Sequence, residues 1–181
     1  MAESGNATLE AILKAARRSS ASEEIGALMD SLTPDLIGLP RADAPSSQRE
    51  RGVIYTRTLH EDAEMELVVF IFPDGATLPL HNHPGMTVYS KVLYGSLAVR
   101  ALDWERPLRA DELELMSQET EALLAADAEQ QQRGRAGART PLIPSLRARR
   151  RADAVLTPST PTARLTPSSG NVHAFAAHDC G

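Results

Sequence analysis

From residue 53 onward, apolar, β-branched and aromatic residues concentrate in short runs, and polar turn signals such as Pro73-Asp74-Gly75 and Pro84-Gly85 separate several of them. Short runs of this composition between turn residues predict β-strands. The pattern therefore predicts a mainly β fold, built as a small antiparallel barrel or jelly roll. The predicted strands are 53–59, 66–72, 77–82, 86–94 and 97–103, and strand-like residues resume near 154–166, where Thr-Pro pairs disfavour pairing.

Two short helices are predicted ahead of the strands, at residues 7–18 and 22–32. Ser22 is a residue type that caps helix N-termini, and the two glutamates that follow it favour the first turn of a helix. The apolar residues of the second helix recur at helical spacing: Ile25, Leu28, Met29 and Leu32. We expect this stripe to pack against the sheet. A connector containing Pro and Ser, residues 38–52, completes an N-terminal lead-in at 1–52.

The charge pattern changes abruptly after the fifth predicted strand. Residues 110–132 carry seven acidic residues and no basic one, and residues 133–151 carry seven arginines and no acidic one. Such a reversal is typical of a surface insertion. We assign 110–152 to a charged insertion, helical or disordered, within a β domain at 53–181. The arginine run at 147–151 is interpreted as part of a disordered loop, and a nuclear-localisation or RNA-contacting patch is the alternative.

Two histidines, His81 and His83, stand one residue apart on a predicted strand. Side chains alternate across a strand, so both should project to one face while Asn82 points to the other. A third candidate, His173, begins a short apolar run after a Gly-bearing turn. Two facing histidines and one from a distant strand can form a metal site. The alternative is a set of hydrogen-bonded interior histidines.

The residues around the two histidines follow the spacing of the first cupin motif. Gly75 precedes His81 with five residues between them, and Gly95 closes a turn after the next strand. Where that motif usually carries glutamate, this chain has Thr87 and Val88, and neither is a plausible replacement ligand. The site would therefore consist of three neutral imidazoles without a carboxylate.

A longer resemblance begins at these residues. The run HNHPGMTVYSKVLYG at 81–95 closely resembles the plant cysteine oxidases and their animal relative, cysteamine (2-aminoethanethiol) dioxygenase. SGNVHAF at 169–175 resembles the second motif of this family, and residues 22–40 resemble its helical lead-in. The resemblance implies a cupin-type jelly-roll barrel and one bound iron(II). By the resemblance, the ligands of that iron are His81, His83 and His173. No further catalytic residue is assigned.

The resemblance also implies a difference at the C-terminus. The family continues past its third histidine with further strands and a segment of the type Asp-Val-Leu-Gly-Pro-Pro-Tyr, whereas this chain stops eight residues after His173. We therefore expect the β domain to be incomplete at its C-terminus, which would expose sheet edges.

The resemblance and the ligand set together imply an iron(II)-dependent thiol dioxygenase. Neutral ligands leave the metal its full positive charge, which favours a substrate thiolate. The expected substrates are a small aminothiol or the N-terminal cysteine of a protein, oxidised with O2 to the sulfinic acid, and the plant relatives suggest a role in oxygen sensing. One alternative is an inactive, truncated cupin-like protein that binds a metal or a partner. Another alternative is a zinc or nickel cupin enzyme, which would need an acidic residue near the site. Zinc, nickel or copper could also occupy a site made of three histidines, because metal affinity alone does not favour iron.

Composition limits the remaining possibilities. A chain of 181 residues that is 42% hydrophobic can form one domain with a sizeable core. No apolar run approaches the ~20 residues that span a membrane, and the single Cys180 excludes an internal disulfide. The net charge of −5 argues against nucleic-acid binding. We expect a monomer in the cytoplasm, with the nucleus as a further location. We assign no chemistry to His60 or His178, and we expect His178 to lie in a frayed tail.

Overall fold

The computed structural model describes residues 2–20, 22–39, 50–83, 85–115, 118, 147–170 and 172–178. Helix α1 spans Ala2–Arg18, α2 spans Glu23–Asp30, and a single 3₁₀ turn, η1, spans Asp35–Ile37. The first five strands are β1 (Tyr55–Glu61), β2 (Glu66–Ile71), β3 (Thr77–Asn82), β4 (Val88–Ser90) and β5 (Leu97–Trp104). The last four are β6 (Ala148–Arg150), β7 (Ala154–Leu156), β8 (Ala163–Leu165) and β9 (Val172–Ala177). None of the described helices is long and apolar enough to cross a membrane.

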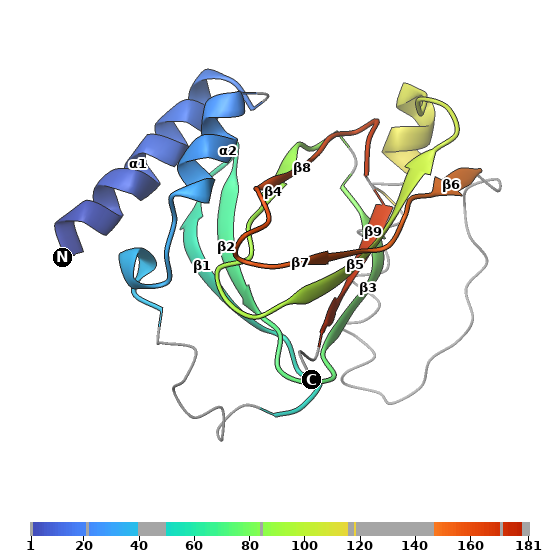
Figure 1. Ribbon diagram of the computed structural model, residues 1–181. Helices are drawn as coiled ribbons and strands as arrows, with labels where there is room; N and C mark the ends of the chain where they lie inside the picture. The colour runs from blue at the N-terminus through green and yellow to red at the C-terminus, as the bar shows by residue number, and fades with distance from the viewer. Residues whose placement is uncertain are drawn as a thin grey trace, which may run out of the picture.

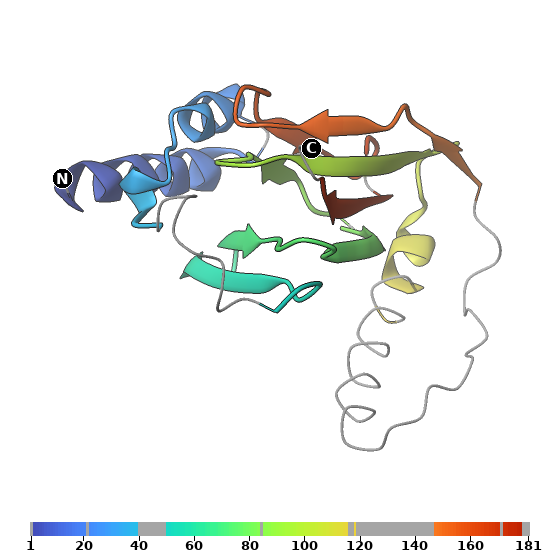
Figure 2. The same ribbon diagram turned by 60° about the horizontal axis from the view of Figure 1, so that its bottom comes forward.

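The strands form three antiparallel sheets. β1 pairs with β2, β4 pairs with β8, and a five-stranded sheet has the order β3-β9-β5-β6, with β7 also paired to β5. Figure 1 shows the N-terminal helices on one side of the molecule and the five-stranded sheet on the other, and Figure 2 shows the strands in layers. The mainly β class with N-terminal helices is confirmed. The barrel is confirmed only in part, because the described strands do not pair into a closed cylinder.

β5 organises the large sheet because it is its longest strand and is paired on both edges. One edge pairs with β9 from Leu97 to Leu102. The other edge is shared by two short strands: β7 pairs with the first half of β5, and β6 pairs with the second half. β6 lies within the segment expected to be a disordered loop, so that expectation is wrong for residues 148–150. An edge strand tolerates charged side chains, and this is why an arginine-rich segment can pair here.

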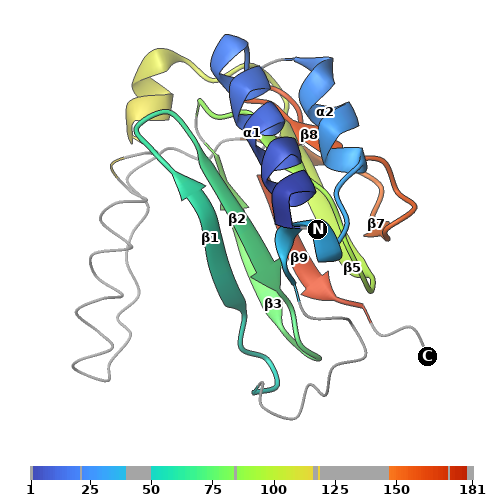
Figure 3. The same cartoon turned by 90° about the vertical axis from the view of Figure 1, so that its left-hand side faces the viewer.

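Helices α1 and α2 pack on each other through a small apolar core (Figure 3). The predicted cap is confirmed, because Ser22 Oγ accepts a hydrogen bond from the Glu24 amide at 3.2 Å. The expected packing of the stripe is confirmed in part, since α2 packs mainly on α1 and meets the strands through Tyr89 of β4. The buried residues of this core are Ile12, Ala15, Ile25 and Met29.

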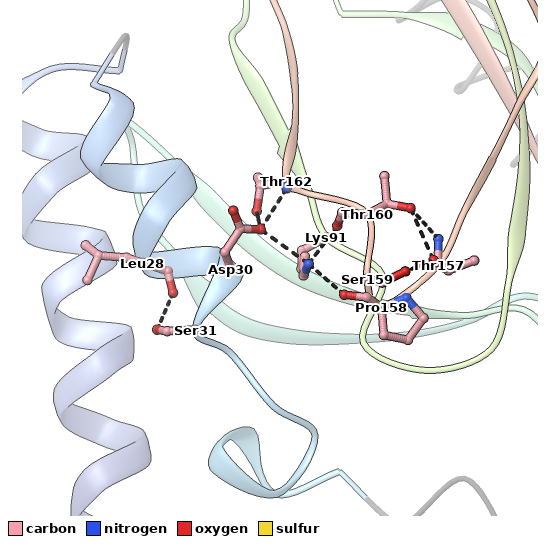
Figure 4. Close-up of polar contacts among 9 residues, drawn as sticks. All are labelled: Leu28, Asp30, Ser31, Lys91, Thr157, Pro158, Ser159, Thr160 and Thr162. Carbon is pink, nitrogen blue, oxygen red and sulfur yellow. Dashed lines mark hydrogen bonds and ion pairs between the residues drawn. The ribbon is translucent and has the colours of Figure 1, made fainter.

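Two side chains at β4 attach the helices to the strands. The Tyr89 hydroxyl lies 3.0 Å from the carbonyl oxygens of both Ser20 and Ser22. The Lys91 ammonium, whose side chain is only 8% exposed, donates to the carbonyls of Pro158 and Thr160 at 2.9 and 2.7 Å. It also lies 3.3 Å from the Asp30 carboxylate at the end of α2, which accepts two bonds of 2.7 Å from Thr162 (Figure 4). This Lys91 contact set joins α2, β4 and the β7–β8 connection.

Candidate metal centre

The pairing of β3 with β9 brings the three predicted histidines together. His81 and His173 are direct cross-strand partners, and His83 follows β3 by one residue. The ring centroids lie 4.4 Å apart for His81 and His173, 5.0 Å for His81 and His83, and 5.1 Å for His83 and His173. One nitrogen from each ring lies within 4.8 Å of the other two. This three-histidine cluster could hold a metal ion.

The cluster is set in an apolar environment. His173 is only 2% exposed, and the Phe175 ring lies 4.9 Å from its centroid. Phe175 in turn makes an edge contact with Phe72, which follows β2. Burial lowers the pKa of His83 below its usual range, and the positive charge that His81 could carry lowers it further. Both effects favour neutral imidazole, which is the form that binds metals.

Backbone carbonyls orient two of the three rings. His81 Nδ1 donates to the Pro79 carbonyl at 2.8 Å, and His173 Nδ1 donates to the Gly170 carbonyl at 3.3 Å. A ring that carries its proton on Nδ1 has its lone pair on Nε2. In both rings the lone pair then lies on Nε2, the nitrogen through which each ring could bind a metal ion, and this arrangement is typical of metal-binding histidines.

The cluster has no carboxylate among the residues that the structure describes. This agrees with Thr87 and Val88 at the position where the cupin motif usually carries glutamate. Three neutral donors from two strands fit a divalent transition metal, for which imidazole is a common ligand.

The other histidines lie outside the cluster. His60 Nε2 contacts the Asp62 carboxylate at 2.8 Å, which also binds Arg17 at 2.9 Å, so it is an ordinary polar residue as expected. The expectation of a frayed tail at His178 is wrong, because its backbone exchanges hydrogen bonds with Ser96. Cys180 and most of the predicted insertion, 116–117 and 119–146, lie outside the described residues.

A shallow, open depression of about 170 Å³ lies beside the cluster residues but opens mainly on the other face of the sheet. Asn82 pairs with Val172, and both point away from the face that carries His81 and His173. Trp104 also lines it, and its buried indole N–H has no hydrogen-bond partner among the described atoms. The depression is therefore separate from the ligand side of the cluster.

Sequence reasoning singled out the three histidines that the structure brings together, but it missed the groups that orient two of their rings. Both acceptors are backbone carbonyls, whose direction depends on local backbone angles. The Gly170 carbonyl belongs to a residue whose φ is +64°, a conformation that only glycine adopts readily. The glycine before β9 was the one available signal for this arrangement.

Fold and cluster together define a mainly β protein with a three-histidine centre that could hold one metal ion. A family model described as PCO_ADO matches residues 28–181. The chain belongs to this PCO_ADO family of thiol dioxygenases, whose fold is cupin-like.

The chain is similar to several curated proteins over part of their length. It is 28% identical over 112 residues to plant cysteine oxidase 1 of Arabidopsis thaliana, covering 58% of this chain and 38% of that protein. It is 43% identical over 51 residues to the probable 2-aminoethanethiol dioxygenase of Dictyostelium discoideum, covering 28% and 23%. With the 2-aminoethanethiol dioxygenase of Homo sapiens it shares 40% identity over 45 residues, covering 25% and 17%. The chain thus spans well under half the length of these relatives.

Proposed function

We propose that this protein is an iron(II)-dependent thiol dioxygenase, which uses O2 to convert a small aminothiol or the N-terminal cysteine of a protein to the sulfinic acid. The observation that carries the proposal is a cluster of three histidines without a carboxylate, in a chain of the PCO_ADO family. The names of the relatives, cysteine oxidase and 2-aminoethanethiol dioxygenase, support a thiol substrate.

His81, His83 and His173 would hold the metal, each through one ring nitrogen. Bound there, iron(II) would supply the Lewis acidity that stabilises a thiolate and the redox capacity for its oxidation by O2. Because the three imidazoles are neutral, they leave the centre positively charged and leave the anionic position to the substrate thiolate. The buried ring of His173 and the neighbouring Phe175 limit water on one side of the cluster.

The proposed reaction balances without an external electron donor. A thiol RSH and one O2 together contain the atoms of the sulfinic acid RSO2H. Sulfur is oxidised by four electrons, and the two oxygen atoms that become bonded to it accept those four electrons. We further propose that the rate follows oxygen supply, as a role in oxygen sensing through oxidised N-terminal cysteine would require.

The test is to reconstitute the protein anaerobically with iron(II) and then add O2 with either cysteamine or a peptide that begins with cysteine. We expect the product to gain two oxygen atoms by mass, with one O2 consumed per thiol oxidised. The relative rates rank the two proposed substrate classes.

His81→Ala removes one proposed ligand and should abolish both iron binding and thiol oxidation. His60→Ala is the matched control, because His60 lies in β1 outside the cluster, and it should retain both. Full iron occupancy in His81→Ala would contradict the assigned ligands. A folded, iron-loaded wild-type protein that oxidises neither thiol would instead favour a cupin-like metal-binding or partner-binding protein.

A further inference from the structure

Asp103 lies on the same face of the five-stranded sheet as His173. β5 and β9 pair Ala101 with His173, and the alternation of side chains then places Asp103 on the face that carries His173. Its side chain is 35% exposed and lies outside the three-histidine cluster. Asp103 is therefore a neighbour of the centre and is not one of its proposed ligands.

The Asp103 carboxylate reaches the backbone that orients His173. Asp103 Oδ1 accepts a hydrogen bond of 2.5 Å from the Gly170 amide. The Gly170 carbonyl accepts the 3.3 Å bond from His173 Nδ1. The hydrogen bond to the Asp103 carboxylate has a charged acceptor, and such bonds are roughly twice as strong as bonds between neutral groups. The bond from His173 to the Gly170 carbonyl joins neutral groups, and 3.3 Å is long for such a bond. The two bonds meet at Gly170, one on the peptide group before its Cα and the other on the peptide group after it.

Gly170 is a point in the chain that needs such an anchor. Its φ is +64°, and a Cβ added there would lie 2.7 Å from Leu165 Cδ2. Glycine tolerates both the positive φ and the close approach of Leu165, but it also has the least restricted backbone of any residue. The bridge between Thr166 and Ser169 restrains the turn before it, and Asp103 restrains the Gly170 amide itself.

Arg151 supports this arrangement from the end of β6. Its guanidinium donates to Asp103 Oδ1 at 3.4 Å and to Ser169 Oγ at 3.1 Å, so it contacts the carboxylate and the turn together. Both charged side chains are partly exposed, so the ion pair alone stabilises little. Its contribution is to restrict where the Asp103 carboxylate can lie.

We propose that Asp103 is a positioning residue for His173. By holding the Gly170 amide, its carboxylate keeps the Gly170 carbonyl against His173 Nδ1, which places the imidazole proton on Nδ1 and the lone pair on Nε2. The inference rests on the proposed metal site, because a fixed Nε2 lone pair matters most for a ligand. Partners that orient a metal-binding histidine typically change metal affinity by about 10–100-fold when they are lost.

The test compares Asp103→Ala and Asp103→Asn with Asp153→Asn. Asp153 is the matched control, because it carries the same charge near the same strand and pairs with Arg150 at 2.5 Å. The first readout is long-range ¹H–¹⁵N NMR of the metal-free protein labelled at histidine, which reports the tautomer of His173. The second is the affinity for Co²⁺, measured anaerobically from its visible absorption bands.

In the wild type and in Asp153→Asn we expect the His173 proton on Nδ1. In Asp103→Ala we expect a mixture of tautomers and a loss of Co²⁺ affinity of about 10–100-fold, while Asp103→Asn, which keeps a weaker acceptor, should lie between. If Asp103→Ala does not fold, the His173 tautomer and the Co²⁺ affinity of Asp103→Asn test the proposal.

A folded Asp103 variant that matches Asp153→Asn in both readouts would overturn the inference. If the wild type fails to bind Co²⁺, the proposed metal site fails, and the tautomer of His173 still tests the role of Asp103.

Discussion

Glu112 is a carboxylate whose ionisation is determined by two neighbouring arginines. Its side chain accepts hydrogen bonds of 2.8 and 2.6 Å from the Arg106 guanidinium and one of 2.9 Å from the Arg109 amide. These contacts, with that from Arg106 the largest, lower the pKa of Glu112 to about 2. The carboxylate lies in the first turn of the helical segment 110–115, where a negative charge is also favourable.

A lowered pKa makes the contribution of Glu112 to stability depend on pH. The contribution is fully present above the ordinary pKa of 4.5 and is lost as the pH falls through the folded-state value of about 2. We expect Glu112→Gln to lower the unfolding temperature at pH 7 and to approach the wild type as the pH nears 2.

Thermal unfolding measured at intervals between pH 7 and pH 2 checks this expectation. Glu114→Gln removes the same charge from an exposed position of the same segment and should change the unfolding temperature at pH 7 much less. A gap between Glu112→Gln and wild type that stays constant over the whole range would contradict the expectation.

At the scale of secondary structure, the Lys91 contact set connects α2 to the strands. Replacing Lys91 by Met keeps most of the side-chain volume but removes the donor shared by the Pro158 and Thr160 carbonyls. Hydrogen bonds that involve a charged group typically contribute about 1.5–3 kcal/mol each, and solvent that reaches the exposed Pro158 carbonyl reduces the loss to about 1–3 kcal/mol. We expect Lys91→Met to lower the free energy of unfolding by about that amount, as measured by urea denaturation.

Lys14→Met is the control for Lys91→Met, because Lys14 lies on an exposed position of α1. It should leave the denaturation midpoint almost unchanged. Equal losses in the two variants would mean that the contacts of Lys91 do not stabilise the attachment of the helices.

Elements with strong local signals could be predicted from the sequence. The run at 77–82 has turn residues on both sides, and β3 forms at those residues. The expected strand 86–94 is reduced to β4 at Val88–Ser90, because its partner β8 offers only three residues and Lys91 turns toward the β7–β8 connection. β6 gave no local signal, since its arginines indicate a loop and only the edge of β5 makes it a strand.

For the candidate site too, local sequence signals could be read, whereas contacts that depend on the assembled fold could not. Alternation along one strand was enough to predict that His81 and His83 share a face. The apolar run after a Gly-bearing turn made His173 a third candidate, and the family resemblance implied that it is a ligand. Neither source predicts that His173 lies directly across from His81, because register between distant strands depends on the assembled sheet. The contact from Asp103 through Gly170 depends on backbone angles and a tertiary contact, and no sequence pattern announces it.

For the whole molecule, the proposed site links two strands that are far apart in the chain. An ion that binds the folded protein and not the unfolded chain stabilises it by RT ln(1 + [L]/Kd), about 2.7 kcal/mol at 100 times Kd. For a protein of this size, we expect the unfolding temperature to rise by about 5–10 °C when Co²⁺ is present at that excess. Differential scanning fluorimetry with and without a chelator measures the shift.

The His81→Ala variant should show little or none of this stabilisation, because it lacks one of three donors. An equal rise in the wild type and in His81→Ala would place the stabilising ion elsewhere on the protein.

The position of β9 between β3 and β5 also has a consequence for synthesis. The two histidines at 81 and 83 leave the ribosome early, while β9 is the last strand of the described chain. A nascent chain that ends before β9 carries only two of the three cluster histidines. Joining the distant strands closes a long loop, which is an entropically costly step in folding. The third histidine therefore joins the cluster only when β9 pairs with β3, and an ion bound by all three rings would hold these two distant strands together.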